Sequence, residues 1–260
     1  MNSEQQRAAC AFLYQHWKDG TRCDGLPPDL CAADRAEAYR VQACIEDNSK
    51  RPPVGWKIAA TSKAGQAHIG VDGPMAGRLL AERQILDGGS LVLGSNLMKV
   101  AEMEFAFRFG EDVMPRAQPY SQAEVLDRVS ALHPAIELPD SRYDRFETVG
   151  DLQLIADNAC AHLFVLGPAA TADWRAMDLV EERPVITMRG EKFIGHGRNV
   201  LGDPRAALAW LANELRQLGV TLKAGRVVTT GTCHAPLPIK AGDFFAADFG
   251  ALGKVSVGFA

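Results

Sequence analysis

The segment 99–110, with the sequence KVAEMEFAFRFG, constrains the fold of this chain more than any other stretch. In a β-strand successive side chains point to opposite faces, so the segment divides into two sets of residues. One face carries Glu102 and Glu104, about 6.6 Å apart along the strand. The other face is apolar and predicts that the strand packs on a core. The apolar face holds Met103, Phe105, Phe107 and Phe109.

Two neighbouring carboxylates on such a strand repel each other, so a positive partner is expected between them. One possibility is a half-solvated edge strand in which Arg108 neutralises the acids. The other is Mg²⁺ or Mn²⁺, which bind carboxylate oxygens and keep positions open for water or substrate. Glu137 favours the metal, because it follows the apolar residues Ala135 and Ile136 on a second buried strand. Glu102, Glu104 and Glu137 are therefore the predicted metal ligands.

Composition and charge exclude several classes of partner. The 260 residues carry a net charge of −4 and no basic cluster, so neither nucleic acid nor an anionic membrane surface is expected to bind. No apolar run approaches the ~18 residues that a membrane span needs. The N-terminus lacks the charged start and apolar middle of a signal peptide, which predicts a cytoplasmic protein. The six cysteines are scattered and form no metal-binding spacing, so reduced thiols are expected.

Helical patterns concentrate at the start of the chain. Ser3 and Gln6 predict a capping box for a first helix that ends near Gly20. A second amphipathic helix is predicted over 33–47, and a later one over 121–130. Between and after these helices the chain is rich in strand patterns without regular strand–helix alternation. An α+β fold is therefore predicted rather than a doubly wound parallel sheet.

A boundary between two parts of the chain is predicted near Pro52 and Pro53, because consecutive prolines end the second helix. Residues 1–52 would form an N-terminal helical part, and residues 53–260 a catalytic core. The length of the chain suits either one large domain or a domain with such a helical appendage.

Short motifs on several predicted strands and loops add a further signal. They begin with E-x-E at 102–104 and A-I-E-x-x-D-S-R at 135–142. Together they resemble the hydratase/decarboxylase branch of the fumarylacetoacetate hydrolase superfamily, from position 55 to the C-terminus. The resemblance implies a mixed β-roll core with the N-terminal helices packed beside it, and a homo-oligomer. The other matching motifs are Gly55-Trp56-Lys57, Thr61-Ser62-Lys63, Ala156-Asp157-Asn158-Ala159, Leu211-Ala212-Asn213 and Ala247-Asp248-Phe249-Gly250.

Lys57 stands out on its own, because lysine is rare in a strand as apolar as 54–60. It could simply pair with a carboxylate, or lie near the metal and hold a substrate anion or move a proton. The resemblance implies the second role, since Lys57 matches the active-site lysine of the G-W-K motif. It also implies that the T-G-T turn at 230–232 holds a substrate carboxylate. By the same resemblance, the expected substrate contacts are Thr232, His234, Asn158 and Cys160, with Cys160 as a pocket-lining thiol rather than a nucleophile. From the residues alone, the T-G-T segment could equally be a turn that needs Gly231, and His234 a structural histidine.

The implied substrate is a small 2-oxo or 2-hydroxy acid. The leading expectation is a metal-dependent hydratase that converts a 2-hydroxy-2,4-dienoate into a 4-hydroxy-2-oxo acid in meta-cleavage breakdown of aromatic compounds. The alternatives are a decarboxylase of 4-oxalocrotonate-like diacids, an acylpyruvate hydrolase and a non-catalytic protein of the same fold. Met75 occupies a position where an aspartate is expected in the hydratases of the branch, so a water-directing acid is either missing or supplied by Glu82.

Overall fold

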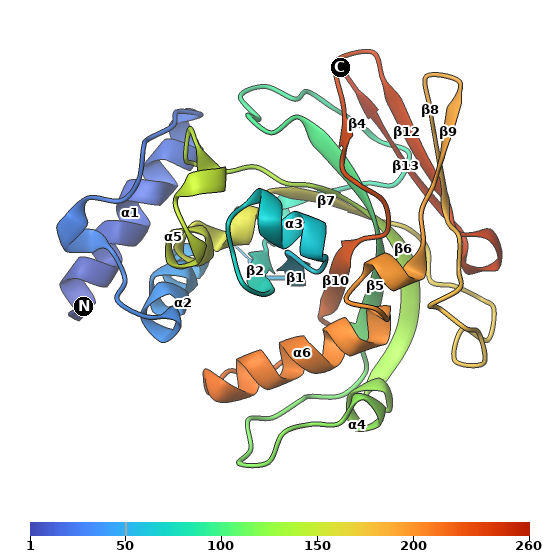
Figure 1. Ribbon diagram of the computed structural model, residues 1–260, viewed down its shortest axis with the longest axis horizontal. Helices are drawn as coiled ribbons and strands as arrows, with labels where there is room; N and C mark the ends of the chain where they lie inside the picture. The colour runs from blue at the N-terminus through green and yellow to red at the C-terminus, as the bar shows by residue number, and fades with distance from the viewer. Residues whose placement is uncertain (50) are drawn as a thin grey trace.

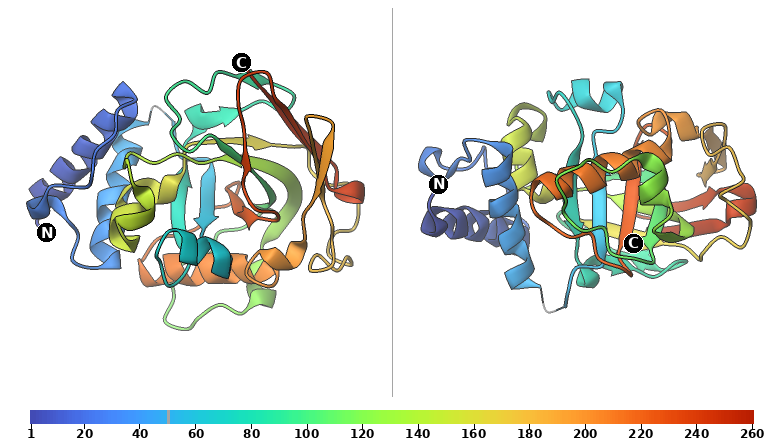
Figure 2. Two further views of the ribbon diagram at one scale, coloured as in Figure 1. Left: turned by 45° about the horizontal axis from the view of Figure 1, so that its top comes forward. Right: turned by 90° about the horizontal axis from the view of Figure 1, so that it is seen from below.

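A computed structural model describes residues 1–49 and 51–260 (Figure 1). Two mixed sheets lie next to each other. At the N-terminal end of the molecule, the helices Ser3–Asp19, Arg35–Ala43 and Asp151–Ala156 gather beside the larger sheet (Figures 1 and 2). Within the described residues no helix combines the length and apolar character needed to cross a membrane. The predicted α+β class is confirmed. The helices are α1 (Ser3–Asp19), α2 (Arg35–Ala43), α3 (Lys63–His68), α4 (Gln122–Leu126), α5 (Asp151–Ala156) and α6 (Pro204–Gln217).

The larger sheet has the strand order β2-β1-β10-β5-β6-β7-β3, with β11 paired to β5. Six spacings of about 4.8 Å would separate the end strands of a flat sheet by roughly 29 Å. Only residues 80–83 join β2 to β3, and so short a segment reaches at most about 18 Å. The sheet must therefore curl, as the predicted β-roll requires. Its strands are β1 (Gly55–Ala59), β2 (Met75–Leu79), β3 (Gln84–Ile85), β5 (Val100–Phe109), β6 (Val129–Leu138), β7 (Leu163–Leu166), β10 (Val227–Thr232) and β11 (Leu237–Pro238).

The smaller sheet covers the outer face of this curl, with the strand order β4-β13-β12-β8-β9. Phe105 of β5 packs edge-on against Phe249, with ring centroids 5.1 Å apart. The predicted apolar face of β5 is indeed buried, because all four of its side chains are at most 1% exposed. The other face of β5, with its glutamates, is thereby left inside the curl. The strands of the smaller sheet are β4 (Ser90–Leu91), β8 (Val185–Met188), β9 (Glu191–Ile194), β12 (Phe244–Asp248) and β13 (Lys254–Phe259).

The boundaries of three predicted helices differ from expectation. Helix α1 is capped by Asn2, whose side chain accepts from the Gln5 backbone N–H, so the capping box lies one residue before the predicted one. Helix α2 ends at Ala43 and continues as a 3₁₀ turn. Helix α4 is shorter than 121–130, because Val129 already pairs with β5 as the first residue of β6. The division of the chain near residue 52 stays a prediction.

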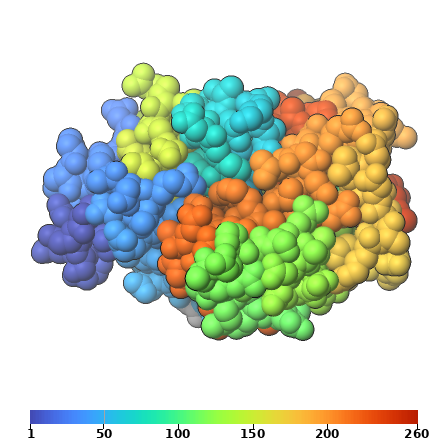
Figure 3. Space-filling view, turned by 60° about the horizontal axis from the view of Figure 1, so that its bottom comes forward, coloured from blue at the N-terminus to red at the C-terminus, as the bar shows by residue number. Residues whose placement is uncertain are grey.

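Helix α6 and the segment before α4 lie side by side over one face of the molecule (Figure 3). Asn213 of α6 connects them, because it accepts from the Tyr120 N–H at 2.8 Å and donates to the Tyr120 carbonyl at 2.9 Å. An asparagine here braces a loop through both of its amide atoms.

Candidate metal centre

Three glutamates from two adjacent strands meet inside the curl of the larger sheet. Glu102 and Glu104 are neighbours on one face of β5, and the sheet register pairs Glu102 with Glu137 of β6. Each contributes a carboxylate oxygen, and these oxygens all lie within 4.8 Å of one another. Glu104 and Glu137 are 1% and 0% exposed, whereas Glu102 is half-buried. The structure thus brings together the three acids that the sequence selected.

Three negative charges are unfavourable in this position. Burial, and then the Glu137 charge, raise the pKa of Glu102 to about 7. Burial raises the pKa of Glu104 well above its usual value, and the charges of Glu137 and Glu102 add to the effect. Glu104 Oε1 and Glu137 Oε2 are buried and accept no hydrogen bond from any residue within the described ranges. A divalent cation would supply their partner, so the donor set fits such an ion.

Lys57 of β1 reaches the same cluster. Its Nζ lies 2.9 Å from Glu137 Oε1 and donates to the Ala159 carbonyl at 3.1 Å. Burial by itself lowers a lysine pKa, but Glu137, and then Glu102 and Glu104, outweigh it and raise the pKa of Lys57 above its usual value. Lys57 therefore stays charged. An ammonium has three donors, and the hydrogen bond to the Ala159 carbonyl uses one of them, so N–H capacity is left for a substrate anion.

The T-G-T segment contacts the cluster through its backbone. The Gly231 N–H donates to Glu104 Oε2 at 2.7 Å, while the Thr230 hydroxyl donates to the Phe105 carbonyl at 3.0 Å. Gly231 has a φ of +102°, and a Cβ there would lie 1.9 Å from Thr61 Oγ1. Both the backbone conformation and the available space therefore require glycine.

Replacing Gly231 by alanine should lower the free energy of unfolding by roughly 2–4 kcal/mol, from overpacking and left-handed strain together. Gly202→Ala is the matched control, because Gly202 has a φ of +82° and a Cβ there would meet nothing within 4 Å. It should show only the strain, about 1 kcal/mol. Urea unfolding of both variants measures the difference. Equal losses would mean that contact with Thr61 is unimportant.

A left-handed turn, Asn158–Cys160, carries the carbonyl that accepts from Lys57. Its three residues have φ values of +58°, +50° and +58°. This conformation costs a non-glycine residue roughly 1–2 kcal/mol, and among such residues asparagine and aspartate tolerate it best. Asn158 bonds the backbone of Arg78 at both amide atoms, accepting at 2.6 Å and donating at 2.9 Å. Since Asn158 is also only 2% exposed, this geometry does not favour its predicted contact with substrate.

The other predicted substrate contacts lie in different surroundings. Burial raises the pKa of Cys160 to about 12, so its thiol is protonated, as expected of a pocket-lining residue rather than a nucleophile. The Thr232 hydroxyl donates to the His234 carbonyl. The His234 ring lies edge-on to Phe193, with centroids 5.9 Å apart. Thr232 is tied to the cluster by the register, which pairs it with Glu104.

Neither of the two positions considered for a water-directing acid, Met75 and Glu82, belongs to the glutamate cluster. Met75 is 1% exposed on β2, opposite Ala59. Glu82 is exposed and accepts from the Ser49 hydroxyl at 2.9 Å. Over the described residues, the group of possible metal ligands contains no acid beyond the three glutamates.

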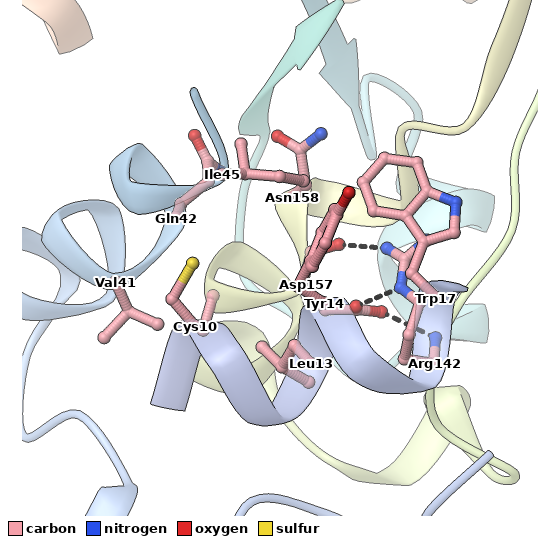
Figure 4. A pocket seen from close by; sticks show the side chains of 11 residues that line it. Cys10, Leu13, Tyr14, Trp17, Val41, Gln42, Ile45, Arg142, Asp157 and Asn158 are labelled. Atoms are coloured by element: carbon pink, nitrogen blue, oxygen red, sulfur yellow. Dashed lines mark hydrogen bonds and ion pairs between the residues drawn. The ribbon is translucent and has the colours of Figure 1, made fainter. Parts of the chain in front are cut away.

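A buried ion pair that supports the left-handed turn was missed by reasoning from the sequence. Arg142 and Asp157, both at most 2% exposed, form this pair (Figure 4). Asp157 also accepts from the Ser141 hydroxyl at 2.8 Å and from the Arg142 N–H at 2.9 Å. Arg142 and Asp157 each belong to a motif that carries the resemblance. The opposite charges of these two motifs were the signal from which an ion pair between them could have been predicted. The cavity beside them measures about 10 Å³, which suits a water molecule but no organic substrate.

No protein-family model matches the chain. Among curated proteins, 2-keto-4-pentenoate hydratase 1 of Dechloromonas aromatica (strain RCB) is 34% identical over 263 residues, which cover 97% of this chain and 96% of the relative. The 2-hydroxyhexa-2,4-dienoate hydratase of Comamonas testosteroni is 32% identical over 235 residues, covering 89% of this chain and 88% of the relative.

A solved structure extends the likeness to the fold. The 4-oxalocrotonate decarboxylase from Pseudomonas putida G7, complexed with magnesium and adipate, superposes with a TM-score of 0.90 at 27% identity. The match covers 100% of this chain and 99% of that one. The chain therefore belongs to the hydratase/decarboxylase branch of the fumarylacetoacetate hydrolase superfamily, together with the 2-keto-4-pentenoate hydratases.

Proposed function

We propose that the protein is a metal-dependent hydro-lyase that adds water to a 2-hydroxy-2,4-dienoate and forms a 4-hydroxy-2-oxo acid. The observation that carries the proposal is the buried cluster of three glutamates with a charged lysine against it. The names of the curated relatives support hydration of such dienoates. The pathway would be the meta-cleavage breakdown of aromatic compounds.

Glu102, Glu104 and Glu137 would hold one Mg²⁺ or Mn²⁺. A bound divalent ion supplies a Lewis acid that stabilises negative charge on the C2 oxygen of a 2-oxo or 2-hydroxy acid. The magnesium in the P. putida decarboxylase supports this choice of cofactor. The Gly231 N–H orients Glu104 for this task by holding its second oxygen.

Lys57 would bind the substrate's carboxylate or deliver a proton through an N–H that does not bond Ala159. Hydration needs a proton at C5 of the dienoate and a water molecule at C4. The segment with Thr232 and His234, and the thiol of Cys160, would line the pocket around the substrate. Because Lys57, Glu104 and Glu137 are at most 3% exposed, a substrate bound against them would be shielded from bulk water.

Decarboxylation of a 4-oxalocrotonate-like diacid is the second candidate. Both reactions use the same charge stabilisation at C2, so the three glutamates fit either. Two observations favour the alternative: the apolar Met75 in place of an acid, and the likeness to a 4-oxalocrotonate decarboxylase.

We further propose a homo-oligomer that works in the cytoplasm. Exposed apolar side chains on strands of the smaller sheet support the assembly, since Ile194 of β9 and Phe244 of β12 are 63% and 54% exposed.

Product identity tests hydration against decarboxylation. With Mg²⁺ and 2-hydroxypenta-2,4-dienoate, the protein should form 4-hydroxy-2-oxopentanoate and release no CO₂. With 4-oxalocrotonate, CO₂ release should be slow or absent. If the dienoate is inert while 4-oxalocrotonate loses CO₂, the protein is a decarboxylase and Met75 is the residue that marked it.

A further inference from the structure

The position of the Lys57 ammonium depends on a backbone group. A lysine side chain has four rotatable carbon–carbon bonds, so a single ion pair leaves its end free to move. The Ala159 carbonyl supplies a second, directional contact at 3.1 Å, in addition to Glu137 Oε1 at 2.9 Å. The carbonyl can point at Lys57 only while the left-handed turn keeps its shape.

One side of the left-handed turn is fixed to β2. Asn158 makes two hydrogen bonds to the backbone of Arg78. A Cβ on the neighbouring Gly77 would lie 2.2 Å from the Asn158 carbonyl oxygen, so the turn packs directly on the β2 backbone. Gly77 is also the residue that the register places opposite Lys57. The turn is therefore held against the strand adjacent to the lysine.

The other side of the left-handed turn is fixed to the segment that follows Glu137. The Asp140 N–H donates to the Cys160 carbonyl at 3.0 Å. Asp157, just before the turn, accepts from both the side chain and the backbone of Arg142 (Figure 4). The turn thus bridges β2, which pairs with the lysine strand β1, and the segment that follows the glutamate strand β6.

We propose that Asn158 and Asp157 are positioning residues of the reaction, because they hold the left-handed turn so that the Ala159 carbonyl fixes the Lys57 ammonium beside Glu137. Two of the three turn residues, Ala159 and Cys160, would not adopt this backbone readily without such bracing. The role of Asn158 and Asp157 in turnover rests on the proposed function, whereas their role in fixing the Lys57 ammonium is independent of it.

The test compares two asparagines that brace backbone in the same way. Asn158→Asp removes the donor to the Arg78 carbonyl and places a negative oxygen beside it. Asn213→Asp makes the same change at the Tyr120 contact of α6, in a different part of the molecule. Asn158→Gly is the second variant, because glycine accepts the positive φ and keeps the chain folded while both bonds are lost.

The first measurement is the rate of reductive methylation of Lys57, followed by mass spectrometry of its peptide. Lys57 is 3% exposed, and both Asn158 variants should be labelled at least about fivefold faster, as local opening exposes the amine. The second measurement is turnover of the dienoate, in which kcat should fall about tenfold through misplacement of the lysine. Mg²⁺ affinity, measured by calorimetry, should stay unchanged, and Asn213→Asp should match the wild type in all three.

Unchanged labelling of Lys57 in both Asn158 variants would overturn the proposal. Equally fast labelling of Lys57 in Asn213→Asp would also overturn the proposal, because faster labelling would then reflect a general loosening of the fold. If the wild-type protein does not hydrate the dienoate, the proposed function fails, while the labelling result still decides how Lys57 is held.

Discussion

Replacing Glu104 by glutamine should abolish tight Mg²⁺ binding and, at the same time, raise the melting temperature of the metal-free protein. The substitution keeps the volume and removes one of three charges. Loss of a direct ligand should weaken metal binding by more than the roughly 10–100-fold typical of an outer-shell partner. Calorimetric titration of Mg²⁺ into the variant and the wild type measures the first effect.

The gain in stability follows from the raised pKa of Glu104. A carboxyl whose pKa is higher in the folded than in the unfolded chain binds more protons when folded. It therefore destabilises the folded metal-free protein at pH values above the ordinary glutamate pKa of about 4.3, and the penalty decreases as the pH falls. Glutamine removes this penalty at neutral pH, so thermal melting in chelator should occur at a higher temperature.

Glu111→Gln is the control for Glu104→Gln, because Glu111 is exposed on the turn after β5. It should change neither Mg²⁺ affinity nor the melting temperature of the metal-free protein. Mg²⁺ should raise the melting temperature of the wild type and of Glu111→Gln, but not that of Glu104→Gln. Wild-type Mg²⁺ affinity in Glu104→Gln would remove Glu104 from the metal site.

Replacing Lys57 by methionine should lower kcat for the dienoate by roughly 10²–10⁴-fold, the range expected for loss of a proton-transfer or anion-binding group. Methionine keeps much of the chain length on β1 but has no charge and no donor. The fold should persist, because a metal ion on the glutamates can still neutralise Glu137. Steady-state kinetics with saturating Mg²⁺, together with circular dichroism, measure both expectations.

Lys223→Met provides the comparison for this variant. Lys223 also pairs with a carboxylate, lying 2.9 Å from Asp112, but the pair is on the surface. An exposed ion pair contributes about 0–1 kcal/mol to stability, so this variant should turn over the dienoate like the wild type. Normal turnover by Lys57→Met would reduce Lys57 to a structural partner of Glu137.

The strand pattern carried most of the predictable information. Alternation along 99–110 placed four apolar side chains on one face and two glutamates on the other, and the structure has both faces as expected. Glu137 was recognisable because an acid in an apolar strand needs a partner. The register between β5 and β6 was harder to predict from the sequence. The pairing of Glu102 with Glu137 depends on how the two strands, of ten residues each, align.

The left-handed turn could not have been predicted. Positive φ is signalled by glycine and, more weakly, by asparagine, whereas this turn continues through Ala159 and Cys160. Its shape is imposed by contacts distant in sequence, such as those of Asn158 with Arg78. For the same reason nothing local in the sequence shows that the Asn158 amide bonds the Arg78 backbone, and its contact with substrate, which the resemblance implied, stays a prediction. Contacts distant in sequence also explain why one helix is shorter than predicted, because Val129 pairs with β5 as part of a strand.

The metal dependence of hydration tests the central claim most directly. Protein treated with chelator and then dialysed would be mixed with 2-hydroxypenta-2,4-dienoate and followed by proton NMR, before and after addition of Mg²⁺. Hydration at the three-glutamate site predicts that the vinyl signals persist without metal. After Mg²⁺ is added, they should give way to the methyl doublet of 4-hydroxy-2-oxopentanoate. Conversion at the same rate in chelator, or none after Mg²⁺ is restored, would contradict a metal-dependent hydratase.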